Sequence, residues 1–130
     1  MTSIQTVTSA SSAIWRNHTA APDVPGLAVR TTYPNNPDGV EVMLEQWQAG
    51  SSEPPHSHPG DDMTVVIEGE MAIQFYTRES GKLAPEGSPL ILRKGETGYI
   101  QAGRIHDAQY TQDCKLVFVH DKAFGFIAQD

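Results

Sequence analysis

The sequence contains very little cysteine: Cys114 is the single thiol among 130 residues. One thiol cannot form an intrachain disulfide, and a zinc site built from several cysteines is excluded. Cys114 lies just before the apolar run 116–119, separated from it by one residue. We therefore expect it to be a structural thiol at a strand rather than a reactive group.

Positive charge is also scarce. The chain has 9 Lys and Arg residues against 16 Asp and Glu residues, which gives a net charge of −7. Arg93 and Lys94 form its longest basic run. Nucleic acids and anionic membrane surfaces both require a positive footprint, so we expect neither as a partner. A small molecule is the remaining class of partner.

Long apolar runs are missing as well. Residues 1–10 show no basic segment followed by an apolar one, as a secretory signal would. No apolar run approaches the length of a membrane span. We therefore expect a cytoplasmic protein.

After residue 40 the sequence shows no helical period of useful length, and short runs of β-forming residues take its place. Turn residues separate these runs at intervals of roughly 8 to 12 residues, which is typical of a sandwich or barrel. Gly69, flanked by two glutamates, predicts a hairpin between two of the runs. The predicted strands are 27–33, 40–47, 63–67, 71–76, 90–92, 97–101, 107–110, 115–120 and 124–127.

The length of 130 residues suits one domain with one core. Residues 1–20 are rich in Ser, Thr and Ala, and their apolar residues follow no clean period. We interpret 1–20 as an N-terminal arm and 21–130 as the folded β domain.

The most informative segment contains His56 and His58, which are two residues apart. In an extended chain such residues point to the same side, about 6.6 Å apart, so both imidazoles can reach one metal ion. Asp61 and Asp62 follow at once and offer carboxylate oxygens. A third histidine, His106, comes much later, and a barrel can bring distant strand ends together. A histidine pair by itself also occurs on ordinary surfaces.

The spacing of these residues resembles the two motifs of the cupin family. The first motif is G-x5-H-x-H-x3-4-E-x6-G, and the second is G-x5-P-x-G-x2-H-x3-N. Every spacing is present here, with Asp62 in place of Glu, Gln101 in place of Pro and Tyr110 in place of Asn. In order, the matching positions are Gly50, His56, His58, Asp62, Gly69, Gly95, Gln101, Gly103, His106 and Tyr110.

The resemblance implies an all-β fold, a cupin-type antiparallel β-barrel of jelly-roll topology. It also implies one divalent transition metal (Fe, Mn, Ni or Zn) held by His56, His58 and His106. Asp62 takes the position of the family's glutamate, but it is one methylene shorter. It is either a fourth ligand or a group that orients a ligand imidazole, and the two readings stay open. The resemblance further implies a homodimer in which residues 1–20 are exchanged.

Five further residues are candidates for the site, each with a plain packing role as the alternative. Tyr99 and Tyr110 are candidates for proton transfer. Gln74, Gln101 and Trp47 are candidates for substrate contact. We expect the two remaining histidines, His18 and His120, to lie outside the ligand set.

Two functions are compatible with these residues. The first is a metalloenzyme acting on a small substrate that chelates the ion through oxygen atoms. With iron it would be a dioxygenase, and with Mn, Ni or Zn an isomerase, lyase or cyclase. The second is a non-catalytic module that binds or senses a small molecule. The fold alone does not choose between them.

Overall fold

The computed structural model describes residues 18–31, 40–122 and 124–130, and all of the regular structure in these ranges is β-strand. No helix in these ranges has the length and apolar character needed to cross a membrane. In chain order the strands are β1 (Thr19–Ala20), β2 (Leu27–Thr31), β3 (Glu41–Trp47), β4 (Ser52–Ser57), β5 (Asp62–Glu68), β6 (Glu70–Glu79), β7 (Lys82–Arg93), β8 (Thr97–Ile100), β9 (His106–Gln109), β10 (Cys114–His120) and β11 (Ile127–Ala128).

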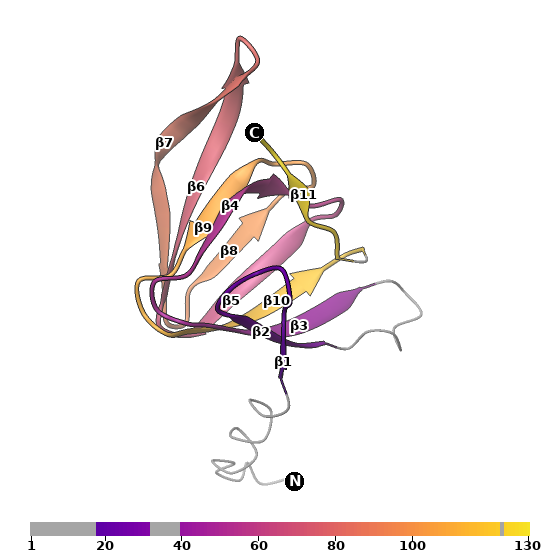
Figure 1. The fold of residues 1–130 in the computed structure, drawn as a ribbon, viewed down its shortest axis with the longest axis vertical. Helices are drawn as coiled ribbons and strands as arrows, with labels where there is room; N and C mark the ends of the chain where they lie inside the picture. The colour runs from indigo at the N-terminus through magenta and orange to yellow at the C-terminus, as the bar shows by residue number, and fades with distance from the viewer. Residues whose placement is uncertain (1–17, 32–39, 123) are drawn as a thin grey trace, which may run out of the picture.

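The strands form two antiparallel sheets that face each other (Figure 1). One has six strands in the order β1-β2-β3-β10-β5-β8, and the other has five in the order β11-β4-β9-β6-β7. The chain passes repeatedly from one sheet to the other, as in a jelly roll. The all-β jelly-roll fold predicted from the sequence is confirmed.

Side chains along the strands alternate between the interior and the outside. The interior itself has an apolar end and a polar end. In β10, residues Cys114, Leu116, Phe118 and His120 are all buried, and the residues between them are half-buried. The apolar end holds the core, and Cys114 belongs to it with a side chain 2% exposed. Burial raises the pKa of its thiol to about 12, as suits a structural cysteine. The remaining core residues are Trp47, Val66, Met71, Ile73, Leu92, Ile100, Ala108, Tyr110 and Leu116.

The predicted hairpin at Gly69 is wrong. β5 pairs with β10 and β8, while β6 pairs with β7 and β9, so the two strands lie in different sheets. Gly69 has a φ of 86° and packs tightly against the backbone of Asp113 and Cys114. The glycine therefore lets the chain turn a corner between the sheets instead of folding back on itself.

Two strands contain prolines that concealed them in the sequence. β4 includes Pro54 and Pro55, and its pairing with β9 is irregular between Glu53 and His56. β7 includes Pro85 and lies at the edge of the five-stranded sheet, where a missing N–H costs no ladder bond. Only 90–92 of β7 was expected from the sequence.

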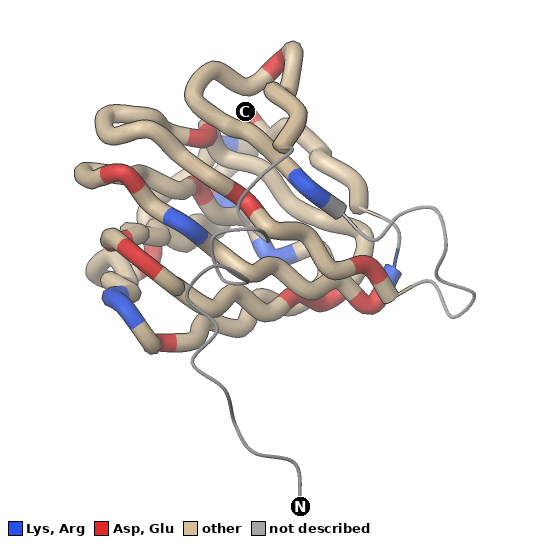
Figure 2. The backbone as a smooth tube through the Cα atoms, turned by 90° about the horizontal axis from the view of Figure 1, so that it is seen from below, with Lys and Arg blue, Asp and Glu red and all other residues tan. Residues whose placement is uncertain are grey.

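Most of the expected N-terminal arm, residues 1–17, lies outside the described residues, as does the end of the expected strand 27–33, residues 32–33. The end of the arm that is described contains β1, which pairs with β2. Lys and Arg are spread singly or in pairs along the described backbone among more numerous acidic residues (Figure 2).

Candidate metal centre

The pairing of β4 with β9 brings the three histidines together. His56 lies opposite His106 in the antiparallel register, and His58 follows immediately after β4. The ring centroid of His56 lies 4.7 Å from that of His58 and 4.3 Å from that of His106. All three side chains are buried, with exposed fractions of 3% or less. We refer to these three residues as the histidine triad.

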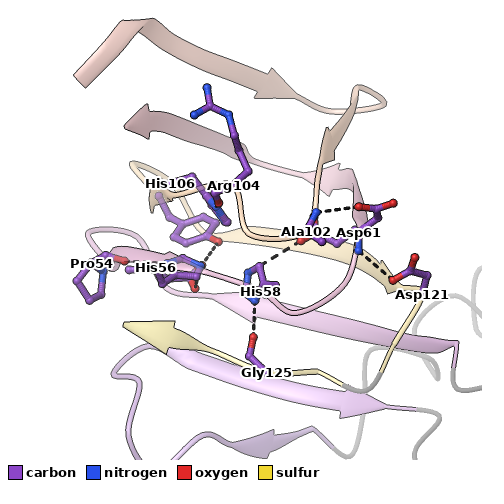
Figure 3. Close-up of polar contacts among 12 residues, drawn as sticks. Pro54, His56, His58, Asp61, Ala102, Arg104, His106, Asp121 and Gly125 are labelled. Atoms are coloured by element: carbon purple, nitrogen blue, oxygen red, sulfur yellow. Dashed lines mark hydrogen bonds and ion pairs between the residues drawn. The ribbon is translucent and has the colours of Figure 1, made fainter. Parts of the chain in front are cut away.

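Each imidazole of the triad is held by a backbone carbonyl (Figure 3). The Nδ1 atoms of His56, His58 and His106 lie 2.7, 2.7 and 2.9 Å from the carbonyl oxygens of Pro54, Gly125 and Arg104 respectively. A carbonyl oxygen can only accept, so each Nδ1 carries the proton and each Nε2 keeps a free lone pair. This is the second-sphere arrangement that orients histidine ligands in metal sites.

The geometry of the triad fits a divalent transition metal. The ligand atoms of the three residues lie within 4.8 Å of one another, and no other set of three His, Cys, Asp or Glu does so within the described ranges. Burial lowers the pKa of His56 to about 3 and that of His106 to about 4, and it also lowers the pKa of His58. The imidazoles are therefore neutral at pH 7, which metal coordination requires.

A carboxyl group that the sequence analysis missed lies against the triad. Glu53 Oε2 is 3.5 Å from His56 Nε2, and Glu53 Oε1 accepts a hydrogen bond from the Tyr110 hydroxyl at 3.0 Å. Burial, together with the nearby Glu45, raises the pKa of Glu53 to about 8. In a regular strand residues 53 and 56 would point to opposite faces, so this contact could not be foreseen from the sequence. The irregularity of β4 between Glu53 and His56 brings them together.

Two further buried carboxyl groups lie close by. Glu45 is on β3 and accepts a hydrogen bond from Trp47 Nε1 at 2.8 Å. Asp62 opens β5, and its Oδ2 is 4.0 Å from His58 Nε2. Burial raises the pKa of both carboxyl groups to about 7. As placed, Asp62 is not one of the mutually close ligand atoms, so its role as a ligand stays a prediction.

Beside His58 is a group of buried polar atoms that have no hydrogen-bond partner. They are both carboxylate oxygens of Asp62, the hydroxyl oxygen of Thr64 and Nε2 of His120. All three side chains are at most 2% exposed. Burying such atoms unpaired is costly, and the usual explanation is a ligand, ion or water in the intact site. Thr64 and His120 were not expected at the site.

Of the predicted site residues, the structure places Trp47 and Tyr110 next to the two glutamates, Glu45 and Glu53. Their rings stack with centroids 4.3 Å apart, and both side chains are buried. Each donates a hydrogen bond to a glutamate. Trp47 Nε1 donates to Glu45, and the Tyr110 hydroxyl donates to Glu53. They therefore form one side of the interior that holds these carboxyl groups in place.

The structure does not bring the other three candidates to the triad. Tyr99 is 58% exposed on the outer face of β8. Gln74 donates to backbone carbonyls of its own strand and of β7. Gln101 lies just after β8 and is exposed. Asp61 instead stabilises the loop after β8, since its Oδ1 accepts a hydrogen bond from the backbone N–H of Ala102 at 2.7 Å (Figure 3).

A cavity of about 160 Å³ reaches the triad through His58 and Glu53. Its wall is mostly apolar and aromatic, with Glu45 as its second carboxyl group. Phe126 stacks on His56 with ring centroids 4.3 Å apart, so the C-terminal segment closes over the histidines. The cavity is lined by Ala21, Val24, Leu27, Val29, Met43, Glu45, Trp47, Glu53, His58, Phe118, Phe124 and Phe126.

Many solved structures share this fold, and three of them illustrate the likeness. An oxalate oxidase is 23% identical with a TM-score of 0.63, and the match covers 84% of this chain and 58% of that one. KdgF from Halomonas sp. is 13% identical with a TM-score of 0.63, covering 84% and 91%. Oxalate decarboxylase from Bacillus subtilis is 13% identical with a TM-score of 0.65, covering 82% and 28%. At these identities the likeness concerns the fold alone.

No curated protein matches the chain in sequence. The family model of the cupin domain matches residues 43–120, which include the whole histidine triad and run from within β3 to the end of β10. This match covers more than half of the chain and agrees with the topology of the two sheets. The chain belongs to the cupin domain family.

Proposed function

We propose that this protein is a metal-dependent enzyme whose histidine triad binds one divalent transition metal and presents it to a small substrate that chelates through oxygen. The observation that carries this proposal is the set of three Nδ1–carbonyl contacts, which leaves three Nε2 lone pairs directed into one place. Three neutral imidazoles fill only part of the coordination sphere of such an ion, so positions remain for a substrate.

When bound, the ion supplies Lewis-acid chemistry at the substrate's oxygen atoms. The chain supplies the surroundings. Phe126, stacked on His56, and Phe124, beside His58, keep bulk water away from the triad. The Glu53 carboxyl group lies 3.5 Å from His56 Nε2 and is held by the Tyr110 hydroxyl, so it can store or release a proton there. These features suit an iron dioxygenase and a Mn, Ni or Zn isomerase, lyase or cyclase alike.

Metal binding can be tested without knowing the substrate. Wild-type protein should take up about one equivalent of a divalent transition metal, measured by elemental analysis after dialysis. The His106→Ala variant should lose affinity by roughly 100-fold or more, because one of three ligands is gone. Gln109→Ala is the matched control, since Gln109 is exposed on the same strand. Less than about a tenth of an equivalent in wild-type protein that cannot be loaded would contradict the proposal.

Catalysis needs a separate readout. Loaded protein should convert at least one member of a panel of enediols, hydroxy acids and diketones, followed by NMR and by oxygen consumption. A ligand that binds tightly and is never converted would instead identify a non-catalytic binding module. That result would be consistent with the metal site and would contradict the enzymatic part of the proposal.

The homodimer and the cytoplasmic location expected from the sequence remain predictions. Met63, Ile67 and Tyr99 expose apolar side chains on the outer face of the six-stranded sheet, which a second copy could cover. Light scattering in solution should give the mass of two chains. A monomeric mass would contradict the dimer.

A further inference from the structure

Three buried carboxyl groups surround the histidine triad, each from a different strand. Glu45 comes from β3, Glu53 from β4 and Asp62 from the start of β5. Glu53 contacts His56, and Asp62 lies 4.0 Å from His58. Together they can carry up to three negative charges against the two positive charges of a divalent ion. With all three carboxyl groups ionised, the loaded site carries a net charge of −1 before any substrate enters.

No basic side chain balances these groups within the described residues that line the cavity. Arg104 is close in sequence to His106, but its guanidinium points away from the triad (Figure 3). It lies over the Phe75 ring and binds Glu86 Oε1 at 2.8 Å. Recognition of a carboxylate or phosphate normally relies on such a cation, so this interior is poorly suited to an anionic substrate.

Unsatisfied acceptors also lie beside His58. Neither oxygen of Asp62 has a hydrogen-bond partner, nor has the hydroxyl oxygen of Thr64, although both side chains are at most 2% exposed. A metal ion, a water molecule or a group that carries N–H or O–H would satisfy the carboxylate oxygens. A protonated amine is one such group.

The cavity itself favours a cation with an apolar body. Trp47, Phe118, Phe124 and Phe126 supply aromatic rings around it, and aromatic faces attract organic cations. Its volume of about 160 Å³ is close to that of an engineered cavity of about 150 Å³ that holds benzene. The space therefore suits a compact molecule of roughly that size.

We propose that the cavity beside the histidine triad binds a small organic cation, a protonated amine with an apolar body, and that it discriminates against carboxylates. The ammonium group would be held by Glu45 and Glu53, and the body would lie among the four aromatic rings. For its place beside a metal, this inference rests on the proposed function. The substrate would then carry oxygen ligands at one end and an amine at the other.

Three ligands of similar shape test the charge preference: benzylamine, benzyl alcohol and benzoate. Their affinities would be measured by calorimetry on zinc-loaded and on metal-free protein. Benzylamine should bind at least roughly tenfold more tightly than benzyl alcohol in both forms, because the preference comes from the glutamates. Benzoate should bind the metal-free form more weakly than either. Benzoate or benzyl alcohol binding the metal-free form as tightly as benzylamine would overturn the proposal.

The Glu45→Gln variant identifies the source of the preference. It keeps an oxygen for Trp47 Nε1 but removes the charge, so benzylamine should lose roughly tenfold or more in affinity while benzyl alcohol changes little. Glu79→Gln is the matched control, because Glu79 is exposed at the far end of β6. An equal loss in both variants would show a general charge effect and refute the cavity as the cation site. Circular dichroism would confirm that both variants are folded.

Failure of this inference can be told apart from failure of the proposed function. Metal content would be determined on the same samples used for calorimetry. Protein that binds no metal but prefers benzylamine refutes the enzyme proposal and keeps the cation site. Protein that binds one equivalent of metal without preferring benzylamine keeps the metal centre and refutes the cation site.

Discussion

At the scale of single residues, Tyr110 is the clearest departure from the family pattern that the structure explains. It occupies the position of the second motif's asparagine, and its hydroxyl donates to Glu53 beside the triad. Its ring stacks on Trp47, which in turn donates to Glu45. Two aromatic residues thus hold two buried glutamates, and they combine packing with hydrogen bonding.

The Tyr110→Phe substitution separates these two roles. The ring still stacks on Trp47, but Glu53 Oε1 loses its donor in a buried setting. We expect the free energy of unfolding to fall by about 1 to 3 kcal/mol, measured by urea denaturation. Tyr99→Phe is the control, since Tyr99 is 58% exposed on the outer face and should change stability by less than about 1 kcal/mol. Equal losses in the two variants would contradict the role given to Glu53.

The sequence predicted the histidine triad from two signals, the spacing of His56 and His58 and the resemblance to the two cupin motifs. Residues two apart in an extended chain share a side, and motif order supplied His106. The three carboxyl groups were harder to foresee. Only Asp62 occupies a specified position of a motif, while Glu53 is at an unspecified position of the first motif and Glu45 lies outside both. Whether Glu45 and Glu53 face inward depends on the register of β3 and on the irregularity of β4, and neither can be read from residue types.

At the scale of elements, the C-terminal segment acts directly on the metal centre. β11 pairs with β4 at His56 and Ser57, and the Gly125 carbonyl just before it accepts from His58 Nδ1. That contact joins residues 67 positions apart in the chain. The orientation of one ligand therefore depends on how the end of the chain is docked.

Gly125→Ala tests this dependence. A Cβ at residue 125 would lie 3.0 Å from two ring atoms of Pro59, so either the segment or Pro59 must shift. We expect the bond to His58 to weaken and metal affinity to fall by roughly tenfold, measured by competition with a chelator. Ala128→Ser also adds one atom to the segment, at an exposed position, and should leave affinity unchanged. Unchanged affinity in Gly125→Ala would show that the carbonyl does not orient His58.

Elements were predictable where β-forming residues cluster and were missed where prolines interrupt. β3 and β10 were found nearly in full because both are rich in β-branched, aromatic and other apolar residues. β4 was missed as a strand, although its extended histidines were recognised, because two prolines normally argue against a paired strand. The sequence also did not predict which strands pair with each other, since the hairpin expected at Gly69 is a corner between the two sheets.

At the scale of the whole molecule, the fold gathers groups whose ionisation opposes folding at both ends of the pH range. Burial raises the pKa of Glu45 from 4.5 to about 7, so its neutral form is favoured in the folded protein. Burial lowers the pKa of His106 from 6.5 to about 4, so the neutral form is favoured there too. The glutamates and the histidines therefore limit stability from opposite directions.

These shifts predict an acidic optimum of stability for the metal-free protein. The contribution of Glu45 is complete below its ordinary pKa of 4.5 and is lost as pH rises through about 7. The contribution of His106 is complete above its ordinary pKa of 6.5 and is lost as pH falls through about 4. The melting temperature should therefore be highest between these two ordinary values. It should fall above pH 6.5, where folding must overcome the ionisation of Glu45.

The Glu45→Gln variant checks this interpretation, because an amide cannot ionise. Between pH 4.5 and 7 its stability relative to wild type should rise by roughly 2 to 3 kcal/mol, because only wild type loses the contribution of a neutral Glu45. Thermal unfolding followed by circular dichroism across the pH range measures both proteins. Glu79→Gln removes an exposed charge and should keep the slope of wild type. If Glu45→Gln also kept that slope, the alkaline limit would come from another group, with Glu53 and its pKa of about 8 as the next to test.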